Sequence, residues 1–236
     1  MGEDKVVAIH QPNFFPWLGY FNKIVLADVF IILDNVQFPK KGGTWCNRVK
    51  LMVGGRPDWV TMPVERNYHG TRLIHDTKIN NSVPWRKQLL KTLKTNYGRS
   101  PFYEEVLPIL ADLIENPTDY LAEFNLNAIM AITERLKMDC GKIIVGSSLR
   151  VQGKATDLLI SLVKQVGGKT YLSGGGAAGY QEDDKFANAG LELRSQNFNH
   201  PTYFQHNSEE FNFGLSIIDL LMNCGIKKAQ ALINNI

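Results

Sequence analysis

Residues 6–34 read VVAIHQPNFFPWLGYFNKIVLADVFIILD, and their pattern decides the fold. Residues 6–9 are a short apolar run rich in β-branched side chains, and the Pro, Asn and Gly that follow favour a loop. Apolar residues then recur at helical spacing from Leu18 to Ala27, and residues 29–33 form a second apolar run, as expected of a strand buried on both faces. The stretch therefore predicts a βαβ unit.

Polar residues follow both predicted strands. His10 and Gln11 come directly after the first strand, and Asp34 and Asn35 after the second. Ligands of open α/β sheets collect at the carboxyl ends of the strands, so these residues are the first candidates for a site.

Composition limits the class of protein. The 236 residues suffice for one α/β domain, or for such a domain with a helical subdomain, and we favour the second. No segment approaches the roughly 18 apolar residues of a membrane span, and a net charge of +3 is too small to argue for a nucleic-acid partner. Residues 1–5 lack the apolar core of a signal peptide, so we expect a cytoplasmic location. The three cysteines form no CxxC pair, so we expect neither disulfides nor a metal site, and we name no cofactor.

The rest of the chain predicts an α/β fold with an inserted helical block. Helical spacing runs through residues 84–138. Strand patterns return at residues 143–145, 170–173 and 191–193. We therefore predict a parallel or mixed sheet with flanking helices. It comprises an N-terminal α/β part (1–83), the helical block (84–138) and a C-terminal part (139–236) that completes the same domain.

Two glycine-containing loops have the composition of a phosphate-binding site. The first carries Lys40 and Lys41 before two glycines and leads into a predicted hairpin over residues 44–64, where Arg48 adds a cation. The second is a run of three glycines starting at Gly174, after a short strand, where backbone N–H groups can approach an anion. This run matches neither the P-loop nor the GxGxxG spacing. A solvated loop and a flexible turn are the alternative interpretations.

The closing helix contains a carboxylate in an apolar run. We expect this helix over residues 215–225, with Gly225 at its end and Asp219 in its middle. A buried carboxylate costs several kcal/mol unless it is paired, so we expect Arg48, Arg150 or a backbone turn as the partner of Asp219.

Several short motifs together resemble one protein family. In chain order they are His10-Gln11-Pro12-Asn13 with Pro16-Trp17-Leu18-Gly19-Tyr20-Phe21, Asp34-Asn35-Val36-Gln37-Phe38, Asn47-Arg48, Tyr171-Leu172-Ser173-Gly174, His200-Pro201 and Ser216-Ile217-Ile218-Asp219-Leu220-Leu221. On these motifs, which span nearly the whole chain, the sequence resembles the WbqC-like protein family. It departs from the family's pattern at Val49, where Asn is common, and at Met222, where Phe is usual.

This resemblance implies a function. Proteins of the family are known mainly from the company of genes for O-antigen, lipopolysaccharide and other surface-polysaccharide synthesis. The resemblance implies bacterial proteins that modify an amino sugar by acyl or aminoacyl transfer.

The first βαβ unit is also similar in layout to the start of nucleotidylyltransferases and pantothenate synthetase, which belong to the HUP class. Those enzymes carry a His-x-Gly-His signature at the helix start that holds ATP phosphates. Trp17-Leu18-Gly19-Tyr20 occupies that stretch here, so both histidines are missing. The layout favours a related fold and argues against ATP-dependent adenylyl transfer.

Our leading hypothesis is a transferase acting on a nucleotide-linked or otherwise phosphorylated sugar, with an acyl or aminoacyl carrier considered as a second partner. His10 is the predicted general base, since imidazole titrates near neutral pH, and Asp34 is expected to orient His10 or bind sugar hydroxyls. The other predicted substrate-binding residues are Gln11, Asn13, Trp17, Tyr20, Lys40, Lys41, Trp45, Asn47, Arg48, Ser173, Gly174, Gly175, Gly176, Tyr180 and His200.

Two other functions stay open. One is a non-catalytic module that binds a carrier or assembly partner through a basic helix over residues 85–97; it predicts that charge reversal at Arg86, Lys87 and Lys91 abolishes function. The other is a nucleotide-binding or nucleotidylyltransferase-like protein in which residues 147–150 are the remnant of a phosphate loop. ATP binding without turnover of amino sugars favours this last alternative.

Overall fold

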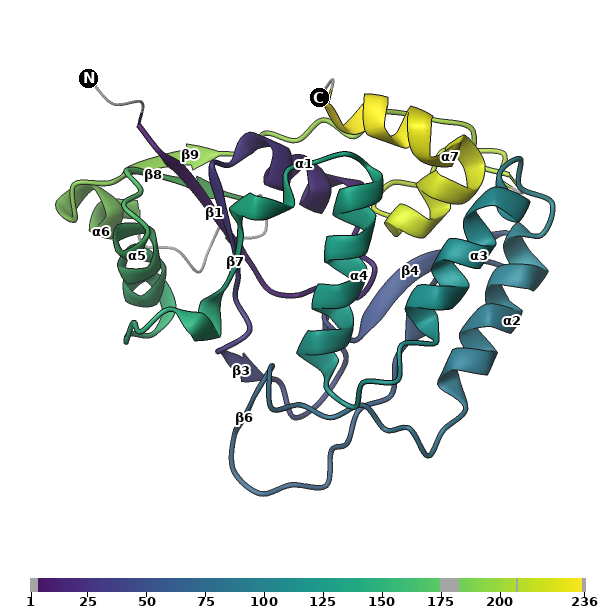
Figure 1. Cartoon of the computed structure of the whole chain (residues 1–236), viewed down its shortest axis with the longest axis horizontal. Helices are drawn as coiled ribbons and strands as arrows, with labels where there is room; N and C mark the ends of the chain where they lie inside the picture. Colours follow the sequence, from purple (N-terminus) through teal and green to yellow (C-terminus); the bar gives the residue numbers. More distant parts are fainter. Residues whose placement is uncertain (1–3, 175–182, 207, 235–236) are drawn as a thin grey trace.

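A five-stranded parallel sheet forms the centre of the molecule (Figure 1). The computed structural model describes residues 4–174, 183–206 and 208–234. The strands lie in the order β7-β2-β1-β8-β9, and each neighbouring pair is parallel. Their bounds are Val6–His10 (β1), Val29–Ile32 (β2), Ile143–Val145 (β7), Thr170–Ser173 (β8) and Glu192–Ser195 (β9). The predicted α/β class is confirmed, and this sheet is parallel.

The predicted βαβ unit is also confirmed. α1 (Leu18–Leu26) connects β1 to β2, and Val7 to His10 pair in register with Val29 to Ile32. All residues of α1 from Leu18 to Ile24 are buried, polar ones included. The helix is covered on more than one side because it packs between the sheet and α7 (Ile217–Asn234).

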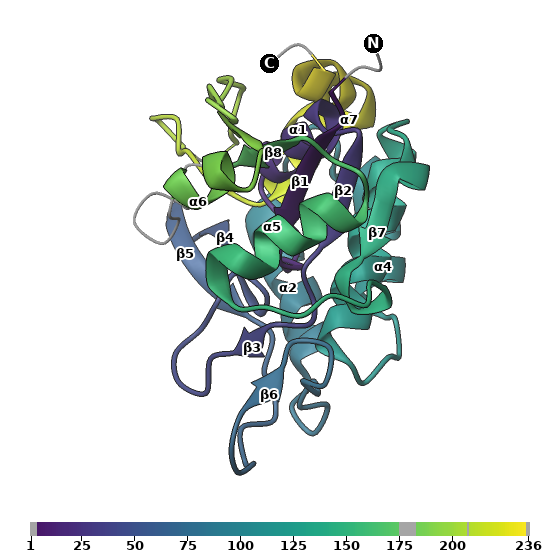
Figure 2. The ribbon, with the colours of Figure 1, turned by 90° about the vertical axis from the view of Figure 1, so that its left-hand side faces the viewer.

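Helices cover both faces of the sheet. α5 (Ala155–Gln165) and α6 (Asp183–Asn188) pack on one face, and Figure 2 shows both of them on the viewer's side of the strands. The core between α5 and the sheet includes Val7, Ile31 and Leu162. α1 and α7 cover the opposite face and share a second, larger core.

The chain between β2 and β7 builds the rest of the molecule. β3 (Gln37–Phe38) pairs with β6 (Arg72–Leu73), and β4 (Arg48–Val53) forms the predicted hairpin with β5 (Arg56–Thr61). The predicted helical block consists of α2 (Trp85–Tyr97), α3 (Tyr103–Ile114) and α4 (Leu121–Arg135). Its apolar side chains belong to the same core as α1 and α7. We keep the three-part division of the chain as a proposal.

Asp219 is fully buried, and its partners differ from those we expected. Its carboxylate accepts hydrogen bonds from the hydroxyls of Tyr97 (3.1 Å) and Tyr203 (2.8 Å) and from Nε2 of Gln205 (3.1 Å). The expectation of an arginine partner was therefore wrong. Burial raises the pKa of the Asp219 carboxyl, while these hydrogen bonds oppose the rise. The carboxylate ties α7 to α2 and to the segment that follows β9.

The first helical segment of α7 ends at Gly225, as we expected, and a second segment follows it directly. Gly225 has a φ of 71°, which kinks the helix, and helical geometry then resumes up to Asn234. A Cβ at this position would lie 2.6 Å from the ring of Phe102, so glycine is required both by the backbone and by the packing.

Candidate functional site

The strand order creates a topological switch point between β1 and β8. The chain leaves β1 through α1 on one face of the sheet and enters β8 through α5 on the other face. Open α/β sheets bind ligands in the crevice where such connections diverge, at the carboxyl ends of the strands. His10 is the last residue of β1 and Ser173 the last of β8, so two predicted residues lie there.

Lys23 of α1 lies at this switch point, and sequence reasoning missed it. Its side chain is only 3% exposed, and Nζ donates a hydrogen bond to the carbonyl of Ile9 at 3.4 Å. Nζ also lies 3.6 Å from the position that a Cβ of Gly174 would take. In the described part of the chain, Lys23 makes no ion pair with a carboxylate. Burial lowers the pKa of this amine to about 8.

Gln196 follows β9 and joins the same group of polar residues. Its Nε2 donates to the carbonyl of Gly19 (2.7 Å) and to Oδ1 of Asn22 (2.9 Å), while its backbone N–H donates to the carbonyl of Ser173. Asn22 is buried like Lys23. The sequence did contain a signal for this site, because Asn22 and Lys23 are adjacent polar residues within a helix that is otherwise apolar.

His10 is partly exposed, and its ring packs against Tyr20 with the centroids 4.7 Å apart. Nδ1 lies 3.2 Å from the carbonyl of Gln11, which favours the tautomer with the proton on Nδ1 and leaves Nε2 as an acceptor. Burial of the ring, and secondly the charge of Lys23, lower the pKa of His10 to about 3. His10 is therefore neutral at pH 7, and as the structure stands it is a weaker base than we expected.

Tyr20 and Cys46, which both contact Gln11, are buried and neutral. The Tyr20 hydroxyl donates to the Gln11 carbonyl (3.2 Å), and Cys46 Sγ lies 3.5 Å from Oε1 of the same glutamine. Burial raises the pKa of Cys46 to about 12 and that of Tyr20 well above its ordinary value. Cys46 is therefore a thiol at pH 7. The Tyr20 ring packs against that of His10 and is 1% exposed. It therefore has no open face on which a ligand could stack.

Asp34 belongs to a neighbouring cluster at the ends of β2 and β7. Its Oδ1 accepts from the backbone N–H of Ser147 (2.8 Å) and its Oδ2 from the Ser147 hydroxyl (2.7 Å). Nδ1 of His75 lies 3.8 Å from Oδ2. Asp34 is 4% exposed and makes no hydrogen bond to His10 within the described residues. The structure thus gives Asp34 a different histidine from the one we expected it to orient.

The predicted hairpin residues form an aromatic and cationic platform. The Arg48 guanidinium lies over Trp59, with 4.2 Å between its carbon and the ring centroid, and Lys50 Nζ lies 5.2 Å from the same ring. Trp45 is 40% exposed and meets Trp59 edge to face. Arg48 Nε is buried without a hydrogen-bond partner in the described chain. Trp45 and Arg48 therefore stay candidates, and Trp59 joins them.

Asn47 is occupied by the hairpin itself. Its Oδ1 accepts from the Thr44 N–H and its Nδ2 donates to the Met62 carbonyl. We therefore assign Asn47 to the fold instead of to a ligand.

The basic loop lies on the β3–β6 side of the molecule (Figure 2). Lys40 and Lys41 are exposed there, and Arg66 holds the loop by donating to the carbonyls of Pro39, Lys40 and Gly42. Lys40 Nζ lies over the ring of Tyr68. No hydrogen bond in the described chain joins these lysines to the switch-point residues, so their predicted role in the same site stays a prediction.

Trp17 and His200 meet in an aromatic cluster. Their rings stack at 6.2 Å, and Phe198, Phe211 and Phe213 surround His200. Nδ1 of His200 lies 2.9 Å from the Pro201 carbonyl, and burial lowers the pKa of this imidazole. The Trp17 ring also covers Gly19, where any Cβ would overlap it.

The remaining predicted residues are of two kinds. Asn13 is buried, and Ser173 donates its hydroxyl to the Arg194 carbonyl across the sheet. Gly175, Gly176 and Tyr180 lie outside the described residues.

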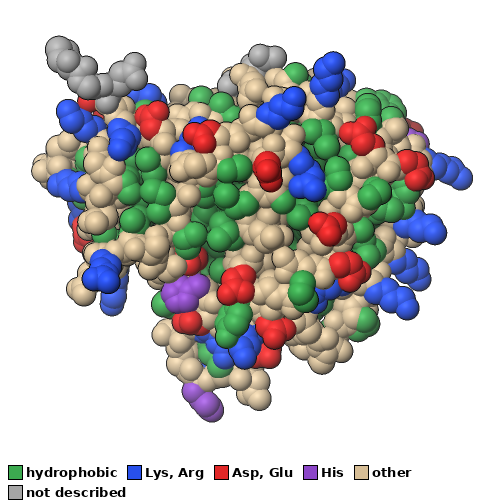
Figure 3. Space-filling model, viewed as in Figure 1, with side chains coloured by type: hydrophobic (Ala, Val, Ile, Leu, Met, Phe, Trp, Pro, Cys, Tyr) green, Lys and Arg blue, Asp and Glu red, His purple; other side chains and the backbone are tan. Residues whose placement is uncertain are grey.

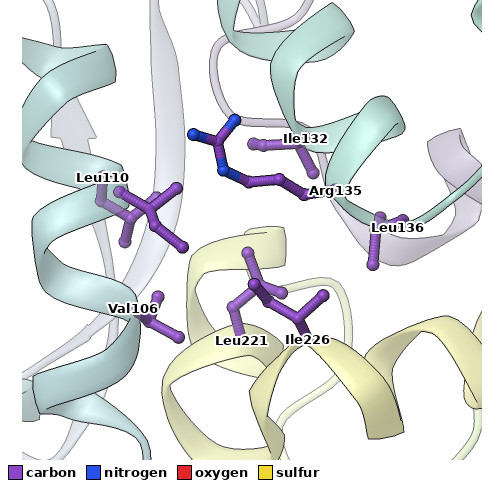
Figure 4. A pocket seen from close by; sticks show the side chains of 8 residues that line it. Val106, Leu110, Ile132, Arg135, Leu136, Leu221 and Ile226 are labelled. Carbon is purple, nitrogen blue, oxygen red and sulfur yellow. The ribbon is translucent and has the colours of Figure 1, made fainter.

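A small apolar cleft, with a cavity volume of about 10 Å³, lies elsewhere, between α3, α4 and α7 (Figure 4). Val106, Leu110 and Leu221 line it, and the Arg135 guanidinium is the charged group at its wall. Arg135 donates to the carbonyl of Ala131 in its own helix. Because the cleft lacks titratable groups other than this arginine, we do not place the chemistry there.

Two other kinds of feature are absent from the described residues. None of the described helices has the length and apolar character needed to cross a bilayer. In the same part of the chain, no group of three or more His, Cys, Asp or Glu residues is arranged to hold a metal ion.

Comparison with known proteins agrees with the motifs. The WbqC-like protein family matches residues 11–231, which is nearly the whole chain. The chain belongs to the WbqC-like protein family. A Mycobacterium tuberculosis protein (strain ATCC 25618 / H37Rv), described as "Uncharacterized protein Rv1507c", is 30% identical to this WbqC-like protein over 230 residues, 94% of each chain. No solved structure matches the chain.

The motifs of this WbqC-like protein meet around the loop that follows β1. The Ser216 hydroxyl donates to the Phe15 carbonyl (2.8 Å), and Asn125 Nδ2 donates to the carbonyls of Pro12 (2.8 Å) and Cys46 (2.7 Å). Phe15 has a φ of 40°, a left-handed conformation that is strained for a side chain of this kind. Contacts from α4 and α7 therefore hold a strained loop directly after His10.

Proposed function

We propose that this WbqC-like protein is a transferase that modifies a phosphorylated or nucleotide-linked amino sugar by acyl or aminoacyl transfer during synthesis of a surface polysaccharide such as O-antigen. The observation that carries the proposal is the convergence of His10, Lys23 and Gln196 from three elements at the topological switch point. Nucleotides and other phosphorylated ligands bind at this place in open α/β sheets. The choice of an amino sugar as the substrate and of a surface polysaccharide as the product of the pathway comes from the family resemblance.

His10 is placed to handle the proton of the attacking amine. In transfer from an acyl thioester, the sugar nitrogen forms a bond to the acyl carbon and the carbon–sulfur bond breaks. The amine proton passes through Nε2 of His10 to the leaving thiolate, because Nδ1 already faces the Gln11 carbonyl. The low pKa of His10 opposes this step while the charge of Lys23 is uncompensated, so an anion beside Lys23 favours it.

A transfer assay tests this proposal. Nucleotide-linked amino sugars are each incubated with acyl thioesters and the protein, and mass spectrometry detects the N-acylated sugar. His10→Gln is the matched variant, because glutamine keeps a polar side chain but cannot carry a proton. We expect a product with the wild type and a rate at least ~100-fold lower with the variant. Equal rates would remove His10 from the reaction, and no product from any pair would count against acyl transfer.

A second candidate function is the binding of an acidic carrier or partner through α2. Lys87, Lys91 and Lys94 are all exposed on this helix, and cationic side chains gather at its edge of the molecule in Figure 3. Arg86 differs from them because its guanidinium donates to Oδ1 of Asn81 and to the carbonyls of Asn116 and Thr118. Charge reversal should therefore be confined to the lysines.

A further inference from the structure

Lys23 is a buried cation that the described fold does not neutralise. A lysine ammonium has three N–H donors, and the described chain gives one of them a partner, the Ile9 carbonyl at 3.4 Å. Buried charges are normally paired because an unpaired one is strongly destabilising. A methionine would fill this place in α1 without that penalty. Packing alone does not account for a lysine here.

The ammonium lies beside Gly174, the residue that follows β8. This residue is partly exposed, and Nζ would be the nearest atom to a Cβ built on it, at 3.6 Å. The backbone of Gly174 is not in the left-handed region that requires glycine. A side chain at this position would contact Nζ, so Gly174 brings the ammonium next to a partly exposed backbone position at the carboxyl ends of β1 and β8.

We propose that Lys23 is the anion-binding residue of the switch-point site and that its ionic partner is a phosphate or carboxylate oxyanion of the substrate, entering beside Gly174. The inference rests on the proposed function and adds the residue that holds the charged part of the substrate. An oxyanion at this position supplies the negative charge, and it supplies acceptors for the two N–H donors that have no partner among the described residues.

Binding of the anion also acts on His10. The Lys23 charge is the second cause, after burial, of the low basicity of this imidazole. Two other titratable groups lie near this site, Tyr20 against the His10 ring and Cys46 beside Gln11, and both are neutral at pH 7 because burial raises their pKa values. The anion therefore offsets the cation that opposes protonation of His10, so that the base is strengthened when the substrate is in place.

Calorimetric titration tests the inference, with pyrophosphate, inorganic phosphate and acetate as probes. Two variants act on the site: Lys23→Met removes the charge at similar volume, and Gly174→Ala fills the space beside Nζ. The matched control is Lys142→Met. Lys142 is a second partly buried lysine that contacts α1, from the turn Cys140–Lys142 before β7, but its Nζ donates to the carbonyls of Val25 (3.1 Å) and Ala27 (2.8 Å) at the C-terminal end of α1.

We expect one of the oxyanions to bind the wild type and Lys142→Met equally, with Kd at least tenfold higher for Lys23→Met and several-fold higher for Gly174→Ala. Preference for pyrophosphate or phosphate over acetate identifies a phosphoryl group; the reverse order identifies a carboxylate. Binding to Lys23→Met within twofold of the wild type overturns the inference, as does absence of binding of every probe to the wild type. If transfer to amino sugars is observed while Lys23→Met binds normally, only the role of Lys23 fails. If Lys23-dependent binding is observed but no amino sugar is acylated, only the proposed function fails.

Discussion

Replacement of Lys23 by methionine should make the protein more stable. Replacing a residue that is kept for function at the expense of stability raises the free energy of unfolding. Replacing a residue that is kept for the fold lowers it. Burial lowers the pKa of Lys23 to about 8, and the amine titrates at 10.5 when it is exposed. At 1.36 kcal/mol for each pKa unit, holding the charged form inside the folded protein costs about 3 kcal/mol at pH 7.

The gain from the substitution is smaller than this cost. Lys23→Met also removes the long hydrogen bond to the Ile9 carbonyl, which contributes about 1 kcal/mol. The free energy of unfolding should therefore rise by roughly 2 kcal/mol, or about 4–8 °C in Tm for a chain of this size. Lys142→Met should lower stability instead, since Lys142 donates to two carbonyls at the end of α1.

The pH dependence separates this explanation from a general packing effect. Below pH 8, Lys23 is protonated in both the folded and unfolded states, so the wild type carries the full cost. Between pH 8 and 10.5 the unfolded state binds more protons than the folded state, so the stability of the wild type rises with pH. Urea unfolding should show that the difference in the free energy of unfolding between the wild type and Lys23→Met is smaller at pH 10 than at pH 7. A variant less stable than the wild type by 1 kcal/mol or more at pH 7, or a difference independent of pH, would refute the reasoning.

Three further predictions follow from other parts of the structure. His10→Gln should flatten the stability–pH profile between pH 3 and 6.5, because the folded pKa of about 3 makes the wild type lose on the order of 4 kcal/mol as the pH falls through that range; parallel urea-unfolding profiles of the two proteins would contradict it. Asp219→Ala should lower the free energy of unfolding by about 3 kcal/mol, because three buried donors lose their acceptor; a change below 1 kcal/mol in denaturant titration would count against it. On α2, Arg86→Glu should unfold at a lower temperature, whereas the double variant Lys87→Glu with Lys91→Glu should keep the wild-type Tm; loss of transfer activity in the double variant would favour the partner-binding function.

The local pattern of the chain was sufficient to predict much of the fold. The βαβ unit was readable because its two apolar runs and the helical spacing between them are continuous in sequence. The helix end at Gly225 was readable because glycine is common there, but the helical segment that resumes after Gly225 was not predicted. The choice between a parallel and a mixed sheet depended on pairings between strands more than a hundred residues apart, which no local pattern encodes.

The site was predicted less completely, for a related reason. His10 and Ser173 follow from the rule that ligands bind at the carboxyl ends of strands. Lys23 and Gln196 do not, because their roles depend on how α1 and β9 lie against that edge. Asp34 also follows from the rule, but its partner, Ser147, lies in the turn after β7, which is distant in sequence.

The central claim is that a phosphorylated amino sugar binds at the switch point beside His10 and Lys23. Nuclear magnetic resonance of the histidine side chains tests it directly, with His10 assigned by its absence from the spectrum of His10→Gln. During titration with a nucleotide-linked amino sugar, the account predicts a saturable shift of the His10 resonance and a higher His10 pKa in the complex, with neither effect in Lys23→Met. Saturable binding that moves His75 or His200 but leaves His10 unchanged would contradict it.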